Sequence, residues 1–274
     1  MCVAGCELAV RRALSRRGFF AGASAAAAFA ATATPGNAQV SVGRHSFQRV
    51  VDLTHTMSAE FPTFSGEPGI EMQRQDDFKK DGFNLFWWRI IEHAGTHLDA
   101  PIHFSENGAT VERIPAAELV VPLAVIDVAA KAAENPDYLL SREDLLVWER
   151  SHGRLPAGAC VAMHSGWAKY ATDLAKFTGR DVDGTLHFPG ISTEAAAWLL
   201  KERRIAGLAV DTLSLDNGVS KDFRTHYLWL PAGRWGLENV ANLDAVPASG
   251  AMLVVGVAKV KGATGGPTRL FALV

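Results

Sequence analysis

The sequence has few cysteines, few tyrosines and no surplus of basic side chains. It contains three Cys and three Tyr in 274 residues, and two of the cysteines, Cys2 and Cys6, lie near the amino terminus. A small scaffold held by disulfides needs many paired cysteines, so that class is excluded. Lys and Arg number 27 against 29 Asp and Glu, which gives a net charge of -2. Nucleic-acid binding needs a basic patch that neutralises phosphates, so we expect a small-molecule partner and no nucleic acid.

Apolar residues and histidines are plentiful by contrast. Hydrophobic residues make up 48% of the chain, which is enough for a sizeable core and too much for a disordered chain. The nine histidines are side chains that titrate near neutrality and bind metals. Their positions therefore carry most of the information about function.

The first 38 residues have the pattern of an export signal. Two arginine pairs precede an alanine-rich apolar stretch over residues 21–33, and small residues lead to a cleavage site after Ala38. Residues 15–20 resemble the twin-arginine signal of bacteria. The alternative is an uncleaved membrane anchor, but an apolar core of roughly 15 residues is short of the roughly 20 that span a bilayer. We expect residues 39–274 to form a periplasmic or secreted domain, with no membrane association after cleavage.

This mature part is predicted to be one α/β domain with a mixed central sheet and flanking helices. Capping-box-like starts at Ser141 and Ser192 predict two helices, the second running to about Arg204. Cys160 lies in an apolar segment and is predicted to be an inert core thiol. Gly and Pro clusters predict loops at residues 64–69, 231–236 and 262–267. The predicted strands are 47–53, 85–91, 120–128, 159–164, 205–211 and 251–257.

One segment, residues 92–104, concentrates polar chemistry. Every second residue from His93 to His103 is His, Gly, His, Asp, Pro and His, while the residues between them are mostly apolar. In an extended chain this alternation places the imidazoles and Asp99 on one face. A loop in which the same side chains converge would serve equally well. Gly95 and Pro101 both disfavour a helix here.

Two imidazoles and a carboxylate at such short spacing form a typical ligand set for a divalent ion. A single histidine in this place would more often be a hydrogen-bonded core residue, but three histidines and one aspartate in eleven residues favour a metal site. Zinc suits a site rich in histidine, and manganese becomes reasonable when carboxylates and water are added. The ligand types leave this choice open.

Residues 93–104, His-Ala-Gly-Thr-His-Leu-Asp-Ala-Pro-Ile-His-Phe, resemble the signature of the metal-dependent cyclase-like hydrolases, the family of bacterial kynurenine formamidase and isatin hydrolase. The resemblance implies a swivelling β/β/α-like fold with a mixed central sheet and flanking helices. It extends over most of the mature chain. Shorter matching strings occur at residues 51–57, 64–68, 164–167, 188–192 and 207–216.

The same resemblance implies roles for individual residues. His93, His97 and Asp99 would bind a metal, and His103 would be the catalytic acid/base. His226 and Glu238, twelve residues apart, would hold a second metal that Asp99 bridges, and Glu238 belongs to the catalytic set as well. Some relatives use a single manganese, so the number of ions, one or two, stays open.

The implied reaction is hydrolysis of a C–N bond in a small amide, such as an aryl formamide, lactam or cyclic imide, by metal-bound hydroxide. A lactone hydrolase or a cyclase/dehydratase of the same family is the alternative within enzymes. A periplasmic metal- or ligand-binding protein without turnover is the alternative outside them. Export makes an environmental substrate more plausible than N-formylkynurenine, which arises inside the cell.

Aromatic residues near the motif are candidates for the substrate pocket. They favour a flat aromatic substrate, although core packing is the more common role of any one of them. Trp87 and Trp88 are adjacent in a predicted strand and must face opposite sides, so at most one of them reaches the pocket. The predicted substrate-binding residues are Phe61, Phe64, Trp88 and Trp167. The family resemblance further implies a homodimer or homotetramer.

Overall fold

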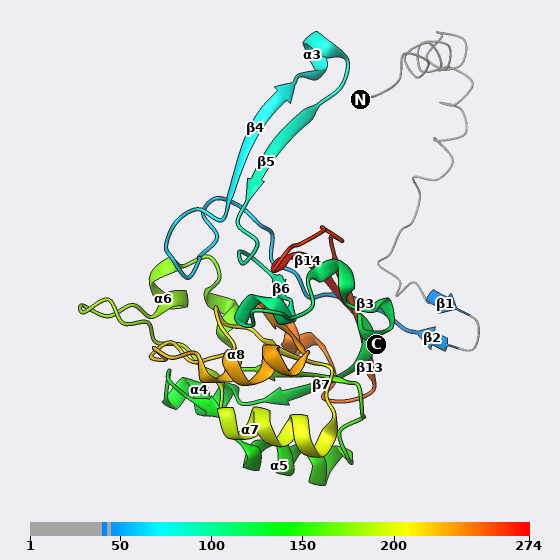
Figure 1. Ribbon diagram of the computed structural model, residues 1–274, viewed down its shortest axis with the longest axis vertical. Helices are drawn as coiled ribbons and strands as arrows, with labels where there is room; N and C mark the ends of the chain where they lie inside the picture. Colours follow the sequence, from blue (N-terminus) through cyan, green and yellow to red (C-terminus); the bar gives the residue numbers. More distant parts are fainter. Residues whose placement is uncertain (1–39, 43–44) are drawn as a thin grey trace, which may run out of the picture. The chain divides into compact units, whose positions relative to one another are not determined.

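The computed structural model describes residues 40–42 and 45–274 of the chain. Residues Ser41–Val274 form one folding unit, whose strands and helices are shown in Figure 1. The predicted export signal and its cleavage site lie outside the described residues. Among the described helices, none combines the length and the apolar character that crossing a membrane requires.

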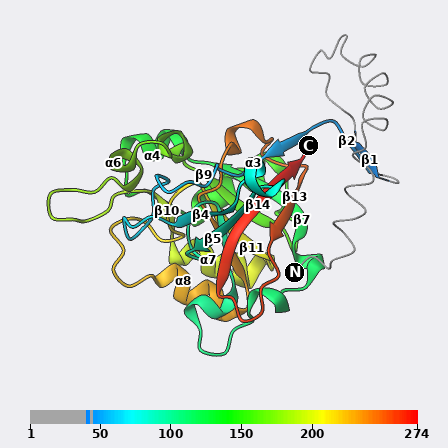
Figure 2. The same ribbon diagram turned by 90° about the horizontal axis from the view of Figure 1, so that it is seen from above.

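The main sheet of the described residues has eight strands in the order β13-β7-β9-β11-β12-β6-β14-β3. Strand β13 pairs with β7 on one side and with β14 on the other, and its long antiparallel pairing with β14 is visible in Figure 2. Seven strands therefore close into a barrel-like sheet, and β3 extends it from β14. The strands are β3 (Val50–Asp52), β6 (His97–Asp99), β7 (Val120–Asp127), β9 (Cys160–His164), β11 (Gly207–Val210), β12 (Trp235–Glu238), β13 (Ala251–Val257) and β14 (Gly265–Leu273).

The sheet is mixed, as predicted. Strands β7, β9, β11 and β12 run parallel to one another, whereas every pairing that involves β6, β13, β14 or β3 is antiparallel. Parallel strands buried on both faces are apolar along their whole length. In β7, Leu123 and Val125 join the cluster inside the barrel, and Ala124 and Ile126 join the cluster beneath the helices. The α/β architecture therefore follows from the apolar runs.

Cys160 lies at the start of β9 and is fully buried. Burial raises the pKa of its thiol, since the thiolate would have no solvation there. It is unpaired. The prediction of an inert core thiol is confirmed.

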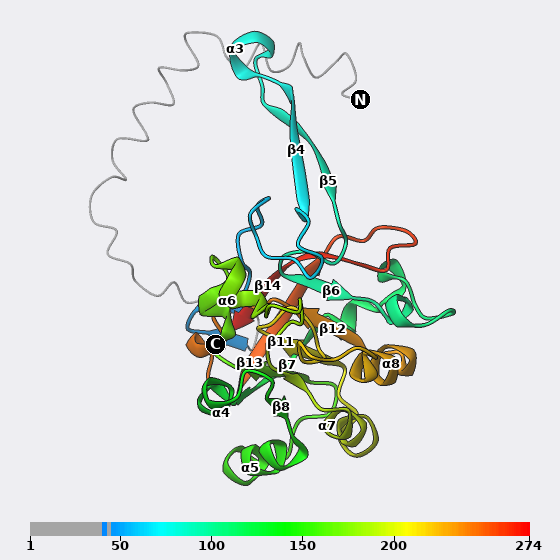
Figure 3. The ribbon, with the colours of Figure 1, turned by 90° about the vertical axis from the view of Figure 1, so that its left-hand side faces the viewer.

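Helices α5 and α7 lie together on one side of the sheet (Figure 3). The predicted capping box at Ser141 is confirmed: its side chain accepts from the Asp144 N–H, and Asp144 accepts from the Ser141 N–H in return. Ser192 caps α7 as predicted, and the helix continues as a π-helical turn to Arg203. The helices are α3 (Phe78–Asp81), α4 (Ala129–Glu134), α5 (Arg142–His152), α6 (Leu174–Thr178), α7 (Thr193–Trp198) and α8 (Arg224–Trp229).

Two of the predicted loops are shorter than expected. Residues 231–236 include the start of β12 at Trp235, and residues 262–267 include the start of β14 at Gly265. A Cβ at Gly265 would lie 2.5 Å from His93 Cε1. The glycine is therefore in this strand because a histidine packs against its backbone.

Strand β5 (Leu85–Ile90) matches a predicted strand but does not enter the main sheet. It pairs only with β4 (Ile70–Asp76), and α3 connects the two. This β4-α3-β5 hairpin, which we call the arm, projects from the sheet in Figures 1 and 3. Two further short pairs complete the described strands: β1 (Val40–Val42) with β2 (His45–Phe47), and β8 (Leu139–Leu140) with β10 (Gly190–Ile191).

Candidate metal centre

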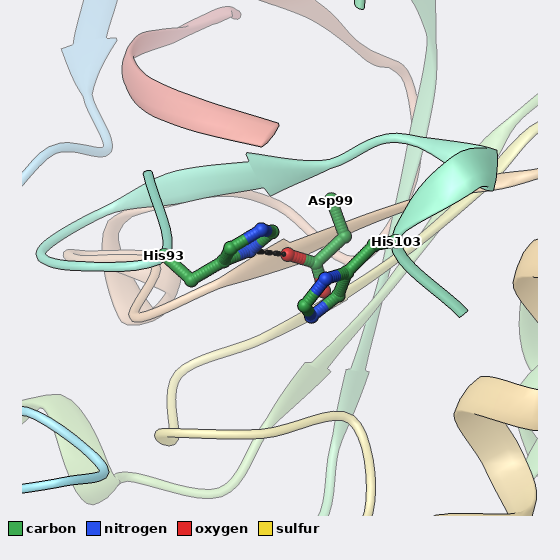
Figure 4. A group of neighbouring side chains, drawn as sticks. All are labelled: His93, Asp99 and His103. Atoms are coloured by element: carbon green, nitrogen blue, oxygen red, sulfur yellow. Dashed lines mark hydrogen bonds and ion pairs between the residues drawn. The ribbon is translucent and has the colours of Figure 1, made fainter. Parts of the chain in front are cut away.

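The histidine-rich segment folds as a turn, a short strand and a 3-10 helix. Only His97–Asp99 is a strand, and Pro101–Phe104 forms the 3-10 turn. The prediction of one extended alternation from His93 to His103 is therefore wrong. Gly95 at φ +65 makes the preceding turn, a conformation that glycine adopts without steric cost. The alternative of a converging loop holds instead, and Figure 4 shows His93, Asp99 and His103 gathered around one point.

Strand β12 brings Glu238 to this segment. In the antiparallel pairing of β6 and β12, Glu238 lies opposite His97 and Gly236 lies opposite Asp99. Directly opposed side chains on one face lie roughly 5 Å apart at Cβ. His97 Nε2 is accordingly 3.3 Å from Glu238 Oε2. A Cβ at Gly236 would lie 2.9 Å from Leu215 Cδ1, so glycine at this position leaves room for the Leu215 side chain.

Helix α8 brings His226, and Asp216 holds it. The Asp216 carboxylate accepts the N–H groups of Thr225 at 2.9 Å and of His226 at 3.1 Å. It also lies 2.6 Å from His226 Nδ1. Because the carboxylate accepts from Nδ1–H, the lone pair of His226 Nε2 is directed toward Asp99 and Glu238.

The structure thus brings five predicted ligands together. Asp99 is at the centre, with its Oδ1 2.6 Å from His93 Nδ1 and 3.3 Å from His97 Nε2. Its Oδ2 is 3.4 Å from His226 Nε2, which is also 3.1 Å from Glu238 Oε1. His97, Asp99 and Glu238 offer ligand atoms that all lie within 4.8 Å of one another. Segments more than a hundred residues apart in the chain meet at one carboxylate.

The buried carboxylates of this cluster are stabilised by positive charge close to them. Burial alone would lower the pKa of His97, yet Asp99 and Glu238 raise it to about 10. The pKa of His226 is likewise raised against the effect of burial, by Asp216, Asp99 and Glu238. Burial would raise the pKa of Asp99, but the surrounding imidazoles hold it well below its ordinary value. Buried carboxylates are thus compensated by protons on imidazoles, a role that a divalent cation can take over.

Two buried atoms of the cluster have no hydrogen-bond partner among the residues that the structure describes. They are His97 Nε2 and Asp99 Oδ2. Orphaned polar atoms are costly in a protein interior, and a metal ion that accepts their lone pairs removes that cost. His97 is also oriented for this, because its Nδ1 lies 2.9 Å from the Gly95 carbonyl, which leaves Nε2 free. Imidazoles and carboxylates in this number fit a divalent metal and leave its identity open.

His103 lies beside the cluster. Its ring is stacked on His93 with centroids 3.6 Å apart and planes 16° apart, and its ligand atom lies within 4.8 Å of those of His93 and Asp99. Burial, reinforced by the neighbouring His93, lowers the pKa of His103 to about 4, against the pull of Asp99 and Glu238. The imidazole is therefore neutral near pH 7 and can accept a proton. This position suits proton transfer and lies close enough for metal ligation.

A cavity of about 220 Å³ opens onto the cluster. It is small compared with drug-binding pockets of roughly 300–1,000 Å³, so it suits a small ring system. His93, His103, His226 and Glu238 form its polar end, and three phenylalanines contribute to its apolar end. Its lining is Pro62, Thr63, Phe64, His93, Ala94, His103, Phe104, Leu213, Ser214, Phe223, His226, Glu238 and Asn239.

The four predicted substrate-binding residues lie in three different places. Phe64 lines the cavity. Phe61 and Trp167 do not; both are buried in a cluster with Phe177. Trp88 lies on the arm and is 62% exposed. The structure therefore brings one of the four to the cavity, and a contact between the others and a substrate stays a prediction.

Several site residues were not identified from the sequence. Asp216 lies in a segment that carried the resemblance, but no signal showed that it orients His226. Thr264, in a predicted loop, bonds His93 Nε2 at 2.9 Å and Glu92 at 2.5 Å. Phe104 and Phe223 line the cavity, and Phe104 directly follows His103. Phe223 has a positive φ of 48, a strained conformation for an aromatic residue that occurs most often at functional sites.

Several known proteins are similar to this chain in sequence and in fold. The Cyclase family profile matches residues 51–217. Isatin hydrolase of Roseibium aggregatum is 32% identical over 242 residues, which cover 82% of this chain and 91% of that protein. Kynurenine formamidase of Salinibacter ruber is 23% identical, over 80% of this chain and 95% of that protein. The solved structure of isatin hydrolase A from Ralstonia solanacearum superposes with a TM-score of 0.78 at 36% identity, covering 82% of this chain and 92% of that one.

Proposed function

The chain belongs to the Cyclase family, and we propose on that basis that it is a metal-dependent hydrolase that cleaves the C–N bond of a small aromatic amide or cyclic imide. The observation that carries this proposal is the meeting of four ligand-type side chains around a fifth, Asp99, beside a small cavity lined in part by phenylalanines. A neutral imidazole, His103, stands beside them. Five ligand-type side chains are available without His103, which leaves its imidazole free for proton transfer.

The ligands proposed for the metal are His93, His97, Asp99, His226 and Glu238. When bound, a divalent metal lowers the pKa of water toward neutrality and polarises a carbonyl group. The two oxygens of Asp99 face different imidazoles, Oδ1 facing His93 and His97 and Oδ2 facing His226. These residues would hold one or two divalent ions, and Asp99 would be a ligand in either case. Zinc and manganese both suit the donors, and metal analysis of the purified protein will decide both questions.

Other groups of the site transfer the proton and orient the ligands. His103 is neutral near pH 7 because its pKa is about 4, so it takes the proton from the attacking water. It then delivers that proton to the leaving nitrogen, which would otherwise depart as an unstable anion. Asp216 and the Gly95 carbonyl hold the imidazoles of His226 and His97 in their orientations.

The shape of the cavity supports a flat aromatic substrate. Phe64, Phe104 and Phe223 line it, and the ring centroids of Phe64 and Phe223 are 5.9 Å apart. Aromatic walls favour a planar ring that stacks against them or meets their edges. The similarity to isatin hydrolases exceeds the similarity to kynurenine formamidases, which supports a cyclic amide fused to an aromatic ring. Opening such a ring yields an amine and a carboxylate in one product.

The proposed location is the bacterial periplasm or the exterior. The support is the arginine-pair, alanine-rich and small-residue sequence of residues 1–38. Replacing Arg16 and Arg17 by lysine in the full chain should retain the protein in the cytoplasm. Fractionation of the host cell checks this, and unchanged export of the double variant would contradict a twin-arginine route.

The test of function is turnover by the metal-loaded protein. We expect hydrolysis of isatin-type cyclic amides to exceed that of N-formylkynurenine, hydantoins and lactones, with loss of activity after chelation and recovery with zinc or manganese. Faster hydrolysis of lactones would favour the lactone hydrolase alternative. Binding of metal without turnover of any of the four classes would favour a binding protein and contradict the proposal.

A further inference from the structure

Thr264 connects a carboxylate to one of the proposed metal ligands. Its hydroxyl oxygen lies 2.9 Å from His93 Nε2 and 2.5 Å from Glu92 Oε2. The backbone N–H of Thr264 donates to the same Glu92 oxygen, at 3.1 Å. The carboxylate, the hydroxyl and the imidazole therefore form a continuous chain of hydrogen bonds that ends at the metal centre.

The direction of these bonds follows from what each group can donate. Glu92 Oε2 acts as an acceptor, because it already receives the Thr264 N–H, and the hydroxyl of Thr264 donates its single proton to it. The hydroxyl oxygen then has only lone pairs left for His93. The Nε2 atom of His93 must therefore carry a proton and donate it to Thr264.

This direction determines which atom of His93 faces the metal centre. With the proton on Nε2, the other ring nitrogen, Nδ1, directs its lone pair toward Asp99, whose Oδ1 is 2.6 Å away. Two lone pairs at that distance would repel each other, so a proton or a cation has to lie between them. In His97 and His226 the roles of the nitrogens are reversed, since Nδ1 is hydrogen-bonded away from the cluster and Nε2 faces it.

The backbone beside Thr264 also accommodates the imidazole. The Thr264 carbonyl accepts the Ala100 N–H at 2.9 Å, which anchors this residue next to the histidine-rich segment. The following residue is Gly265, where a Cβ would lie only 2.5 Å from His93 Cε1. The ring of His93 is in turn stacked on that of His103, with centroids 3.6 Å apart. A fixed orientation of His93 therefore also fixes the ring against which His103 lies.

We propose that Glu92 and Thr264 are positioning residues, which hold His93 so that its Nδ1 binds the metal and its ring supports His103. This inference rests on the proposed metal-dependent function. Neither residue lines the cavity, so both act through His93 and not on the substrate. The carboxylate strengthens the effect of the hydroxyl, because an O–H that donates to a charged acceptor polarises its oxygen and makes it a better acceptor itself.

The alternative is that Glu92 only holds the loop before β14 in place. A second glutamate allows the two roles to be separated, because Glu112 Oε2 accepts the Gly262 N–H of the same loop at 3.1 Å. In the part of the chain that the structure describes, none of the hydrogen bonds of Glu112 leads to an imidazole. If holding the loop were the only role of Glu92, removing either carboxylate would have similar effects.

The experiment measures the zinc affinity of the full chain and its variants by competition with a chromophoric chelator, without substrate. Thr264→Val keeps the shape of the side chain, removes the hydroxyl and should weaken zinc binding by roughly 10- to 100-fold, whereas Thr264→Ser keeps the hydroxyl and should stay within about 3-fold of wild type. Glu92→Ala frees the Thr264 proton to turn toward His93 Nε2 and should weaken binding by roughly 10-fold, against less than about 3-fold for Glu112→Ala. Circular dichroism checks that each variant is folded.

A second measurement identifies the protonated nitrogen of each ligand histidine. Long-range proton–nitrogen correlation spectra of the zinc-loaded chain, labelled at histidine nitrogen, distinguish a ring protonated at Nδ1 from one protonated at Nε2. Wild type should have one ligand histidine protonated at Nε2, which is His93, and two protonated at Nδ1. A role in holding the loop alone would not set this pattern.

Three outcomes would overturn the proposal. The first is equal zinc affinity in Thr264→Val and Thr264→Ser. The second is an equal loss in Glu92→Ala and Glu112→Ala, which would assign Glu92 to the loop. The third is a zinc-loaded wild type in which every ligand histidine is protonated at Nδ1, a result that needs no variant to fold.

The same measurements separate this inference from the proposed function. A wild type that binds no zinc would overturn both. Zinc binding with the expected loss in Thr264→Val, but without hydrolysis of any substrate, would contradict the enzymatic function and leave the positioning of the metal ligand by Glu92 and Thr264 supported.

Discussion

Asp99 and Asp144 are two buried aspartates that the chain treats differently. Asp144 receives hydrogen bonds from Tyr138 and from both the N–H and the hydroxyl of Ser141, and Lys131 forms an ion pair with it. Asp99 lies among imidazoles, and its Oδ2 has no hydrogen-bond partner in residues 40–42 and 45–274. A carboxylate whose oxygens are all hydrogen-bonded or ion-paired within its own chain has a structural role, because it needs no external ligand. A carboxylate left with an orphaned oxygen indicates a ligand that the chain does not itself supply.

The largest expected effect is the loss of stability on metal removal, which should depend on Asp99 and not on Asp144. Wild type loaded with zinc or manganese at about 1,000 times its Kd should gain about 4 kcal/mol of stability over the chelated protein, because metal binds the folded state alone. Thermal melting with and without chelator measures this. Asp144→Asn should respond to the chelator as wild type does, whereas Asp99→Asn should not respond. A wild-type Tm that is insensitive to chelation would contradict the metal centre.

The same measurement has a pH dependence with a definite sign. Without metal, the pKa of His97 is raised to about 10. A histidine with a raised folded-state pKa stabilises the fold fully below its unfolded value of roughly 6.5, and this contribution is lost as the pH rises toward 10. The metal-free protein should therefore lose stability between pH 7 and pH 9. Metal binding at pH 7 should release protons into a weakly buffered solution.

The next effect distinguishes proton transfer from metal ligation. His103→Ala should lower turnover by roughly 100-fold or more, because the leaving nitrogen loses its proton donor. Metal content should stay near that of wild type. His93→Ala is the matched comparison, since the two rings are stacked, and it should lose both metal and turnover. Loss of metal in His103→Ala would make this residue a ligand, and unchanged turnover would remove its catalytic role.

A smaller effect is expected one step away from the metal. Asp216→Asn removes the carboxylate that orients His226 and should weaken metal binding by roughly 10- to 100-fold. Asp222→Asn is the control, because Asp222 is exposed and pairs only with neighbouring groups such as Arg224. Competition with a chromophoric chelator measures both affinities. Equal affinities in the two variants would show that Asp216 has a structural role alone.

Asp216 also shows where sequence reasoning stops. The ligands His93, His97 and Asp99 could be predicted because they lie in one short segment, where spacing and residue type are visible together. The contact between Asp216 and His226 depends on how the chain between them folds. A single aspartate in a loop shows no sequence pattern that predicts such a contact. The sequence could therefore indicate a metal, but not the group that orients one of its ligands.

The fold shows the same division. The apolar run Ala251–Val257 is a strand with the predicted bounds, and alternate residues at its start are buried, because apolar and β-branched residues fit a half-buried pleated surface. Strand β14 begins inside a predicted loop, since Gly265 is needed for the approach of His93. Strand β5 has a strand-like composition, yet nothing local could show that it belongs to an arm. Position relative to distant segments was the missing information in both cases.

The smallest predicted effect concerns Asp144, the aspartate whose carboxylate is hydrogen-bonded by its own chain. Burial would raise the pKa of Asp144, but Lys131, the Ser141 N–H and the Tyr138 hydroxyl hold it below its ordinary value. A lowered folded-state pKa stabilises the protein above the unfolded value of roughly 4, and the contribution is lost as the pH falls through the folded value. Asp144→Asn should cost about 1 kcal/mol at pH 7, and this difference from wild type should shrink below pH 4.

Urea unfolding of the metal-loaded protein at pH 7 and pH 5, and of the chelated protein near pH 3, measures this difference. Glu143→Gln is the matched control, because Glu143 is the adjacent residue in the same helix and its pair with Arg150 is exposed on both sides. It should change the free energy of unfolding by less than about 0.5 kcal/mol. If the two variants were equal, or if the Asp144→Asn difference grew in acid, the capping network would not be the source of stability. The hydrogen bonds of Asp144 would then not stabilise its carboxylate, and the contrast that we draw between Asp144 and Asp99 would be wrong.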